Sequence, residues 1–566
     1  MDSMHLEVVS EAVIRSTKAI ISNLGAVDAA IVLGAGVMFY IIRRRVRSTN
    51  VRGPWSSNFF FGVVTQLMRA PDPGDIYEKW ATQYGSVFSV PGILGRRRIV
   101  LADPKSLAHF AARETYGYVG TPQSKRFQVK LIGKGLFYAE GDSHKRYALL
   151  ALWEGISDKN TTSRQRRALN PAFSNEAIKN LTHIFFDSAY KVGISRQRPS
   201  SSIHNTSPTM YITVSRVTTD LLIGRLSLDT IGLAGFSHDF GTLSGKTSNI
   251  ATAFDSLGSQ ASYIDTTIFL LSFIIPAVRR IPTARQVMLN DLGESMRRLG
   301  ETFLAAADET VADKSVIGLL AKSASTEKIS HEEVAAQINV LLIAGYETTS
   351  ISLTWALIEL ARNPAMQTKL RNELLQSGGD PTWEELTNHG SFLDAFTCEI
   401  LRMHPALPEI SRMAAEDDLV PLSEPIKDAR GKLIDSVFVS KGTNVTLPIQ
   451  CINRSEVFWG PDAKMFNPAR WIDESHGVDK HRAQELQGYR HLLTFSDGPR
   501  MCLGKVFAVT EFKAVLSVLL RNFTFELPRG PDTAIGRHRN LLPRPKIEGE
   551  AGYDVPLKIQ HYVGAE

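Results

Sequence analysis

The stretch FSDGPRMCLG, residues Phe495 to Gly504, places a cysteine between two glycines and close to an arginine. A thiol has to become a thiolate before it can hold a metal ion, and a cationic neighbour such as Arg500 favours the thiolate. Gly498 and Gly504 permit a tight turn and let backbone N–H groups approach the sulfur. The stretch therefore indicates that Cys502 is suited to hold a metal ion as a thiolate.

The other two cysteines, Cys398 and Cys451, share no C-x-x-C spacing with Cys502. An odd number of cysteines in a chain of 566 residues argues against a disulfide framework or a zinc site and favours a reducing compartment. We expect Cys398 and Cys451 to be inert buried thiols. With 43% hydrophobic and 22% charged residues the chain can bury a large core, as one domain or two. The net charge of +6 is small and forms no long basic stripe, so nucleic-acid binding is not expected.

The N-terminal region contains a candidate membrane anchor. Residues Ala19 to Ile42 hold a single charge, Asp28, and are followed by four arginines within five positions, Arg43, Arg44, Arg45 and Arg47. About 20 apolar residues suffice to cross the hydrocarbon layer. A cleaved signal peptide is the alternative, but the length of the run and the basic cluster after it favour an uncleaved single-pass anchor. The positive-inside rule then leaves residues 51–566, the large domain after the anchor of residues 1–50, in the cytosol.

The large domain is expected to be mainly α-helical with small β-sheets. Apolar residues recur at helical spacing over long stretches beyond residue 290, and one run of about 30 residues, EEVAAQINVLLIAGYETTSISLTWALIELAR, is nearly apolar in its middle. Its flanks are too charged for a second anchor, so it is expected inside the protein. Further helices are predicted over Ile76–Tyr84 and from Pro104, and short strands over Val87–Val90, Arg98–Ala102, Val437–Val439 and Asn444–Pro448.

Within the long buried helix, AGYETT (Ala344 to Thr349) places a glycine, an acid and two hydroxyls where apolar side chains would pack better. One interpretation is structural: Thr348 bonds to a carbonyl of the preceding turn and Glu347 pairs with a cation. The other is functional: a hydroxyl and a carboxylate face a cavity and deliver protons to a bound molecule. The hexapeptide alone does not decide between them.

Two further motifs lie between this helix and the cysteine. In EILRMHPALP, Glu399 and Arg402 are three residues apart and lie on one helix face. In FNPARW, Arg470 follows a proline in an irregular stretch. Glu399 held by both arginines would lock a helix to a loop, which predicts a buried architectural triad.

In this order, AGYETT, E-x-x-R, F-N-P-A-R-W and FSDGPRMCLG resemble the signatures of the cytochrome P450 family. The last matches the motif F-x-x-G-x-R-x-C-x-G at every fixed position. The resemblance spans about Gly53 to Val563, and the anchor is similar to that of microsomal members. LSLDTIGLAGFSHDF and LLPRPKIEG are similar to fungal members, particularly those of basidiomycetes that act in secondary metabolism. The resemblance implies the cytochrome P450 fold after one transmembrane helix.

The resemblance also implies a cofactor, haem b (iron protoporphyrin IX), with Cys502 as its axial ligand. A thiolate ligand donates electron density to the iron and promotes O–O cleavage. Glu347 and Thr348 match the acid and alcohol that deliver protons, and Ala344 is expected in the cavity wall. The remaining positions that match cofactor-binding residues of the family are Phe495, Gly498, Arg500 and Arg412, the two arginines matching propionate ligands.

The chain departs from the family near His144. The family has a helix in which an aromatic or histidine precedes an arginine by four residues, both reaching the propionates, but here His144 and Arg166 are 22 apart. Removing residues 146–163 restores the four-residue spacing. We hypothesise that this segment is a translated intron or a true extra loop; a cDNA that encodes it throughout would exclude the intron. If the insertion is real, the helix is split and Arg166 is in doubt as a haem contact.

A second departure is Val192 to Arg225, rich in Ser, Thr and Arg and without a sustained period. It reads as a flexible loop near the cavity mouth or, as we favour, a gene-model artefact or disordered insert. The same cDNA tests it.

The resemblance predicts a monooxygenase of the endoplasmic reticulum membrane with its catalytic domain in the cytosol. It would hydroxylate or epoxidise a hydrophobic small molecule from the bilayer, such as a terpenoid. Because the chain has no flavin or nicotinamide motif, electrons are expected from NADPH–cytochrome P450 reductase, with Lys505 a candidate docking residue. The alternatives are a catalytically impaired product of the two insertions and an oxygen-independent isomerase on the same fold, against which the acid–alcohol pair argues.

Overall fold

The computed structural model describes residues 48–140, 169–196, 219–246, 283–308, 331–472, 480–538, 540–550 and 555–564, with a few single positions between 267 and 318. The predicted anchor, Ala19 to Ile42, lies outside the described residues. So do His144, Arg166 and the segment 146–163, and the predictions made for them stay predictions.

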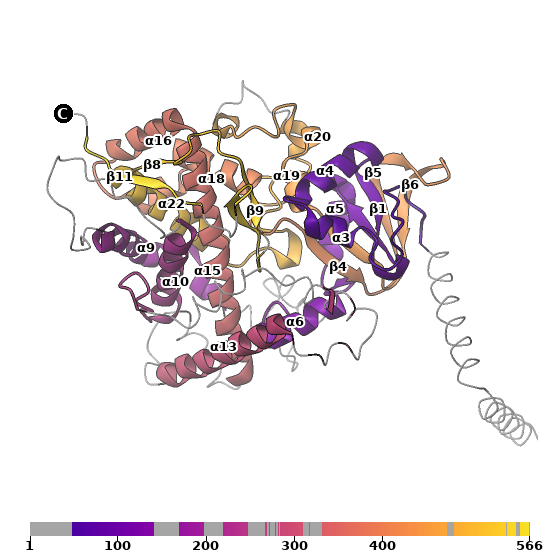
Figure 1. Cartoon of the computed structure of the whole chain (residues 1–566), viewed down its shortest axis with the longest axis horizontal. Helices are drawn as coiled ribbons and strands as arrows, with labels where there is room; N and C mark the ends of the chain where they lie inside the picture. Colours follow the sequence, from indigo (N-terminus) through magenta and orange to yellow (C-terminus); the bar gives the residue numbers. More distant parts are fainter. Residues whose placement is uncertain are drawn as a thin grey trace, which may run out of the picture.

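A long central helix, α15 (His331–Arg362), runs through the middle of the molecule (Figure 1). Among the described residues, Glu332–Arg362 is the helix that is long and apolar enough to cross a membrane, but most of it is buried by the protein itself. The prediction that this run is a core helix is therefore confirmed. Around it lie α9 (Asn175–Arg196), α10 (Thr219–Phe236), α13 (Ala284–Asp308), α16 (Pro364–Gln376), α18 (Phe392–Met403) and α22 (Lys505–Asn522).

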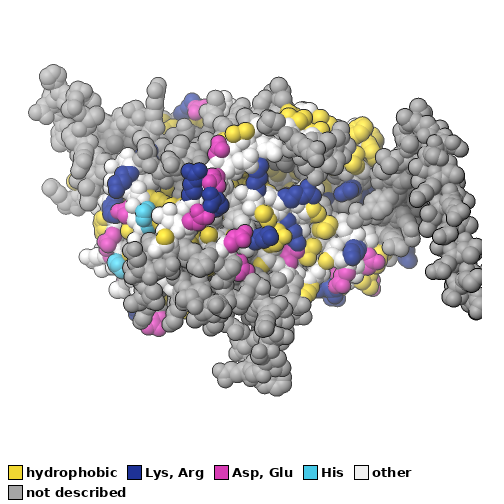
Figure 2. Space-filling model, turned by 90° about the horizontal axis from the view of Figure 1, so that it is seen from below, with side chains coloured by type: hydrophobic (Ala, Val, Ile, Leu, Met, Phe, Trp, Pro, Cys, Tyr) yellow, Lys and Arg dark blue, Asp and Glu magenta, His cyan; other side chains and the backbone are white. Residues whose placement is uncertain are grey.

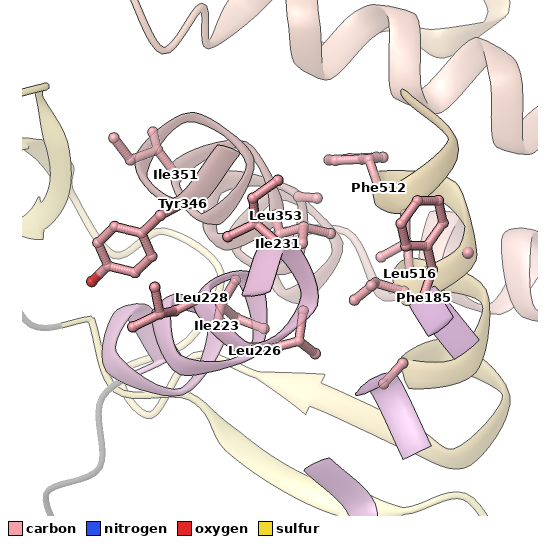
Figure 3. Packing of buried hydrophobic residues seen from close by; sticks show 14 of the residues in the cluster. Phe185, Ile223, Leu226, Leu228, Ile231, Tyr346, Ile351, Leu353, Phe512 and Leu516 are labelled. Carbon is pink, nitrogen blue, oxygen red and sulfur yellow. The ribbon is translucent and has the colours of Figure 1, made fainter. Parts of the chain in front are cut away.

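Among the described elements, α10 packs most extensively against α15 (Figure 3). Gly345 makes this approach possible, because a Cβ added there would come within 2.8 Å of the Ile231 side chain. Beside this pair, Phe185 of α9 packs edge to face on Phe507 of α22, with ring centroids 4.9 Å apart. The helix that follows the cysteine motif is thereby fixed to the same apolar core as α15.

A mixed five-stranded sheet lies on the opposite side of α15 from α9 and α10 (Figure 1). Its order is β1-β2-β7-β4-β3, formed by Val87–Pro91, Arg97–Leu101, Asn444–Leu447, Ile410–Ala414 and Tyr118–Val119. β1 and β2 form an antiparallel hairpin, β2 pairs in parallel with β7, and Arg98 is opposite Asn444. In the described part of the chain, two-stranded sheets are formed by β5–β6 (Asp418–Lys427, Leu433–Val439), β8–β11 (Phe523–Glu526, Lys558–His561) and β9–β10 (Ile535–His538, Arg544–Ile547).

The shorter helices connect these layers. They are α3 (Val64–Arg69), α4 (Pro73–Tyr84), α5 (Pro104–Arg113), α6 (Pro122–Ile132), α17 (Trp383–Thr387), α19 (Ile449–Asn453), α20 (Glu456–Trp459) and α21 (Lys480–Ala483), with 3₁₀ turns η1 (Ile93–Gly95), η2 (Asn170–Phe173), η4 (Pro468–Trp471) and η5 (Gly498–Arg500). α4 and α5 begin at prolines whose preceding aspartates cap the helix. The predicted helices over 76–84 and from Pro104 and the predicted strands are confirmed to within a few residues.

The ends of the segment Val192 to Arg225 are helical. Val192 lies in α9 and is buried, and Leu222 and Ile223 lie in α10 and are buried in the main core. Our description of the whole segment as a loop or disordered insert was wrong for these ends, because the few apolar residues at each end suffice to continue a core-facing helix. Residues 197–218 lie outside the described part of the chain.

The surface is charged but mixed in sign. On the face shown in Figure 2, Lys and Arg side chains lie beside Asp and Glu side chains over the described residues. This pattern agrees with the small net charge and with the absence of a basic stripe in the sequence.

Candidate active site

The cysteine loop ends at the N-terminus of α22. Its 3₁₀ turn η5 needs glycine at position 498, where φ is +63° and an added Cβ would lie 2.8 Å from the carbonyl oxygen of Ala111. Cys502 donates its backbone N–H to the carbonyl of Phe495 at 2.8 Å, which closes the loop. At Gly504 φ is −84°, so the backbone itself does not demand the glycine that we expected for a tight turn there.

The prediction that Cys398 and Cys451 are buried thiols is confirmed. Cys502 is exposed, whereas Cys398 and Cys451 are buried. Burial raises the pKa of the Cys398 thiol to about 11 and that of Cys451 to about 12, which keeps both protonated and inert. Because Cys502 precedes the first turn of an 18-residue helix, the helix dipole stabilises its thiolate.

One face of α15 keeps accessible surface within an otherwise buried stretch. Leu341, Ala344, Gly345 and Thr348 are partly exposed, while Leu342, Ile343, Tyr346, Glu347 and Thr349 are buried. The accessible positions have the spacing i, i+3, i+4, i+7 and therefore share one side of the helix. Ala344 and Thr348 are thus available to a bound molecule, whereas Glu347 points elsewhere.

The polar side chains of AGYETT have partners inside the protein. The Thr348 hydroxyl donates to the carbonyl of Ala344 at 2.6 Å. Glu347 pairs with Arg544 of β10 at 2.6 Å, and both side chains are almost completely buried. The contacts of the structural interpretation are therefore present. The functional interpretation stays open for Thr348, which lies on the accessible face, whereas the Glu347 carboxylate does not face that side of the helix.

Arg412 and Arg500, the arginines expected to bind the propionates, converge on one buried acid. The Nε of Arg412 lies 2.9 Å and the Nε of Arg500 lies 3.9 Å from Oε1 of Glu114, which follows α5. Arg500 also donates to the carbonyl of Ala139 at 2.6 Å. Burial raises the pKa of Glu114, against the opposing effect of the two arginines. The sequence assigned both arginines to one site, and the structure places them together. No pattern in the sequence indicated Glu114.

The predicted triad of Glu399, Arg402 and Arg470 is confirmed. Arg402 donates to both carboxylate oxygens at 2.8 Å, and Arg470 donates to Oε1 at 3.1 Å. The same carboxylate accepts from Trp471 Nε1 and from the backbone N–H of Asn467. All three triad side chains are buried, so α18 is locked to the loop that carries η4.

A second ion cluster joins α18 to α22 and to the start of the cysteine loop. Asp394 of α18 accepts from Lys513 at 2.6 Å and from Arg490 at 2.8 Å. Arg490 lies at the head of the loop that leads to Cys502. Lys505, which we suggested as a docking residue, places its ammonium 5.2 Å from the ring centroid of Tyr489, so this cation already has an interaction within the chain.

Glu511 is a buried acid that the sequence interpretation missed. It lies on α22 and is completely buried, and burial raises its pKa to about 8, with a hydrogen bond to Thr349 opposing the shift. Within the described residues neither of its carboxylate oxygens has a well-aligned hydrogen-bond partner. A signal was present, since TEFK interrupts an apolar helix as AGYETT does.

These residues fit a haem group. An exposed thiol just before a helix N-terminus suits a ligand of the haem iron, the accessible face of α15 can border a bound molecule, and the paired arginines suit carboxylates. In the described part of the chain no cluster of three or more His, Cys, Asp or Glu residues offers an alternative metal site.

The chain matches one protein family and is similar to several fungal proteins. The family described as Cytochrome P450 matches residues 155–548. The chain is 48% identical to the cytochrome P450 monooxygenase claQ of Ampulloclitocybe clavipes, over 91% of this chain and 94% of that protein. It is 46% identical to claP of the same fungus, over 95% and 99%. It is 30% identical to cytochrome P450 monooxygenase 205 of Postia placenta, over 96% and 98%.

Proposed function

The chain belongs to the cytochrome P450 family and is a haem-binding monooxygenase, and we propose that it hydroxylates or epoxidises a hydrophobic small molecule at a membrane. The observation that carries the proposal is the exposed thiol of Cys502 in its glycine-containing loop. The other two thiols, Cys398 and Cys451, are buried and therefore cannot serve as ligands of the haem iron. A terpenoid or another secondary metabolite is the substrate class that we favour. A reductase that takes electrons from NADPH is the partner, because the chain carries no flavin or nicotinamide motif.

In this proposal Cys502 would ligate the iron, and Arg412 and Arg500 would hold the propionates. Bound haem would supply the activation of O₂ and the transfer of one oxygen atom to the substrate. The chain contributes the accessible face of α15, where Thr348 Oγ1 donates its hydrogen to the carbonyl of Ala344 and keeps lone pairs that can accept a hydrogen bond from a bound molecule. Glu347, kept in place by Arg544, is the acid next to that hydroxyl along the chain. We assign Thr348 and Glu347 to proton delivery on this basis.

Replacement of Glu347 by glutamine is expected to lower kcat by roughly 10²-fold, the lower end of what a general acid contributes. The glutamine can still accept a hydrogen bond from Arg544, so the haem spectrum is expected to stay unchanged. Turnover is measured with reductase and NADPH, using a compound selected because it perturbs the haem spectrum on binding. Unchanged kcat with an intact spectrum would remove Glu347 from proton delivery.

Attachment to the membrane is supported by sequence and by exposure. Trp55, Phe59 and Phe60 are 84%, 48% and 58% exposed, a few residues after the cluster of arginines at 43–47. Tryptophan and other aromatic side chains favour the interface between lipid and water. We therefore propose a single-pass protein of the endoplasmic reticulum with this aromatic patch at the cytosolic lipid surface.

The test of the proposal is the reduced, carbon monoxide difference spectrum of the full-length protein in membranes washed with alkaline carbonate. A strongly red-shifted Soret band that stays with the membrane pellet is expected, and Cys502→Ser should abolish that band while Cys451→Ser leaves it in place. A band in the supernatant would contradict membrane attachment. An unshifted band, or no haem, would favour the impaired product, and the spectrum should then be repeated without residues 146–163. NADPH-independent turnover of a hydroperoxide would favour the isomerase.

A further inference from the structure

Glu114 is the one acid in ion-pair distance of both arginines assigned to the propionates, within the described residues. It is 2% exposed, and its partners Arg412 and Arg500 are 21% and 10% exposed. It follows α5 directly, and the next residue, Thr115, has φ of +94°, a strained conformation for a β-branched side chain. The backbone therefore turns sharply at this point, directly after the acid that lies between the two arginines.

The contact between Glu114 and Arg412 is an ion pair without an aligned hydrogen bond. Oε1 of Glu114 and Nε of Arg412 are both buried, and neither has a partner at hydrogen-bond geometry among the described residues. Buried polar atoms are nearly always hydrogen-bonded in a finished site. A cavity borders Glu114, lined also by Phe110, Leu493, Ser496 and Asp497. Arg412 and Arg500 donate to the backbone carbonyls of Ser411 and Ala139 at 3.2 and 2.6 Å. The backbone therefore orients both arginines, and their contact with Glu114 is an ion pair beside a cavity.

Among the described residues, the charges that act on Glu114 balance before any propionate is counted. Arg412 from β4 and Arg500 from η5 face it with positive charge, and Asp497 from the cysteine loop adds a negative one. The two cations equal the two carboxylates of Glu114 and Asp497. Two propionates would add two further negative charges, and each nearby anion disfavours ionisation of a buried carboxyl. Burial already raises the pKa of Glu114.

We propose that Glu114 takes up a proton when haem binds. Glu114 helps to orient Arg412 and Arg500 through these ion pairs, the propionates would take over as partners of both arginines, and a proton from the solvent would neutralise the carboxylate. Glu114 is then a positioning residue for the cofactor, and the inference rests on the proposed role of the two arginines. Proton uptake makes haem binding stronger at low pH and weaker as pH rises.

The experiment is the equilibrium partition of haem between the holoenzyme and apomyoglobin from pH 6 to 9. The ratio of wild-type to Glu114→Gln haem affinity is expected to fall by up to tenfold per pH unit, because the glutamine cannot take up the proton. Comparison with the variant cancels the titration of Cys502 and of the propionates. Glu416→Gln, which removes an exposed acid that pairs with Arg113 beside the site, is the matched control and should follow the wild type.

Parallel pH curves for wild type and Glu114→Gln would overturn the proposal. If Glu114→Gln does not fold, the infrared spectrum of the wild-type holoenzyme at pH 7 should contain a second protonated carboxyl band, besides that of Glu511, and this band should shift in Glu114→Asp. A spectrum in which no carboxyl band shifts would equally contradict the proposal. The carbon monoxide spectrum keeps the two proposals apart. A red-shifted band with parallel pH curves refutes Glu114 alone, whereas loss of the band in the wild type refutes the assignment of Cys502.

Discussion

Replacing Glu399 by alanine is expected to destabilise the protein by about 3–5 kcal/mol, a large part of the stability of a typical domain. The carboxylate accepts five hydrogen bonds, three from arginines, one from Trp471 and one from Asn467. Without it, Arg402 loses the carboxylate with which it pairs in the interior, and Arg470 keeps only its ion pair with the partly exposed Asp462, at 2.8 Å. The measurement is urea unfolding, followed by circular dichroism and by loss of the haem–thiolate band.

Glu294→Ala is the matched control for this prediction. Glu294 and Arg297 of α13 have the same three-residue spacing and pair at 2.7 Å, but both are exposed. Solvent screens such a pair, so the urea midpoint should stay in place. If Glu399→Ala does not fold, Glu399→Gln keeps the shape and removes only the charge, and it should unfold at a lower urea concentration than wild type. Equal midpoints for Glu399→Gln and the wild type would show that the charge of Glu399 does not stabilise the fold.

Replacing Glu511 by glutamine should have the opposite effect, a gain of about 3.5 kcal/mol at pH 7. The folded protein keeps this carboxyl protonated up to about pH 8, whereas an unfolded glutamate loses its proton near pH 4.5. Between pH 4.5 and 8 the wild type therefore becomes less stable as pH rises, since only the unfolded chain releases the proton. At pH 7 about 2.5 pH units of this range have been crossed, at ~1.4 kcal/mol each.

The check is the free energy of unfolding of both proteins at pH 4.5, 6, 7 and 8. The two should agree at pH 4.5 and diverge as pH rises, with Glu511→Gln the more stable. Glu526→Gln, an exposed acid on β8, serves as the control and should track the wild type. Curves that stay parallel over this range would mean that Glu511 is ionised in the folded protein.

The features that the sequence predicted are those whose partners lie close together in the chain. The helical period identifies α15 and its burial, the glycine at position 498 identifies the cysteine loop, and the three-residue spacing of Glu399 and Arg402 identifies half of the triad. The motif F-N-P-A-R-W identified Arg470 as the third member of the triad. Its contact with Glu399 was predicted because one buried acid can pair with two arginines.

The residues that the sequence did not reveal have distant partners. Arg544 is 197 residues from Glu347, and Lys513 is 119 residues from Asp394. No local pattern fixes which cation meets which acid across such separations, because the pairing depends on how the helices and sheets pack. Glu511 is different. The polar interruption in its apolar helix was visible, and the rule applied to AGYETT would have identified it.

The parallel pairing of β2 with β7 also bears on the order in which the protein can form during synthesis. Strand β2 ends at Leu101, and its neighbour β7 begins only at Asn444. At ~5–20 residues per second, a ribosome needs roughly 17–70 s to cover that interval. During this time one edge of the β1–β2 hairpin has no partner strand, and an open edge can pair with other chains. Early synthesis is thus the stage at which the nascent chain depends most on protection from aggregation.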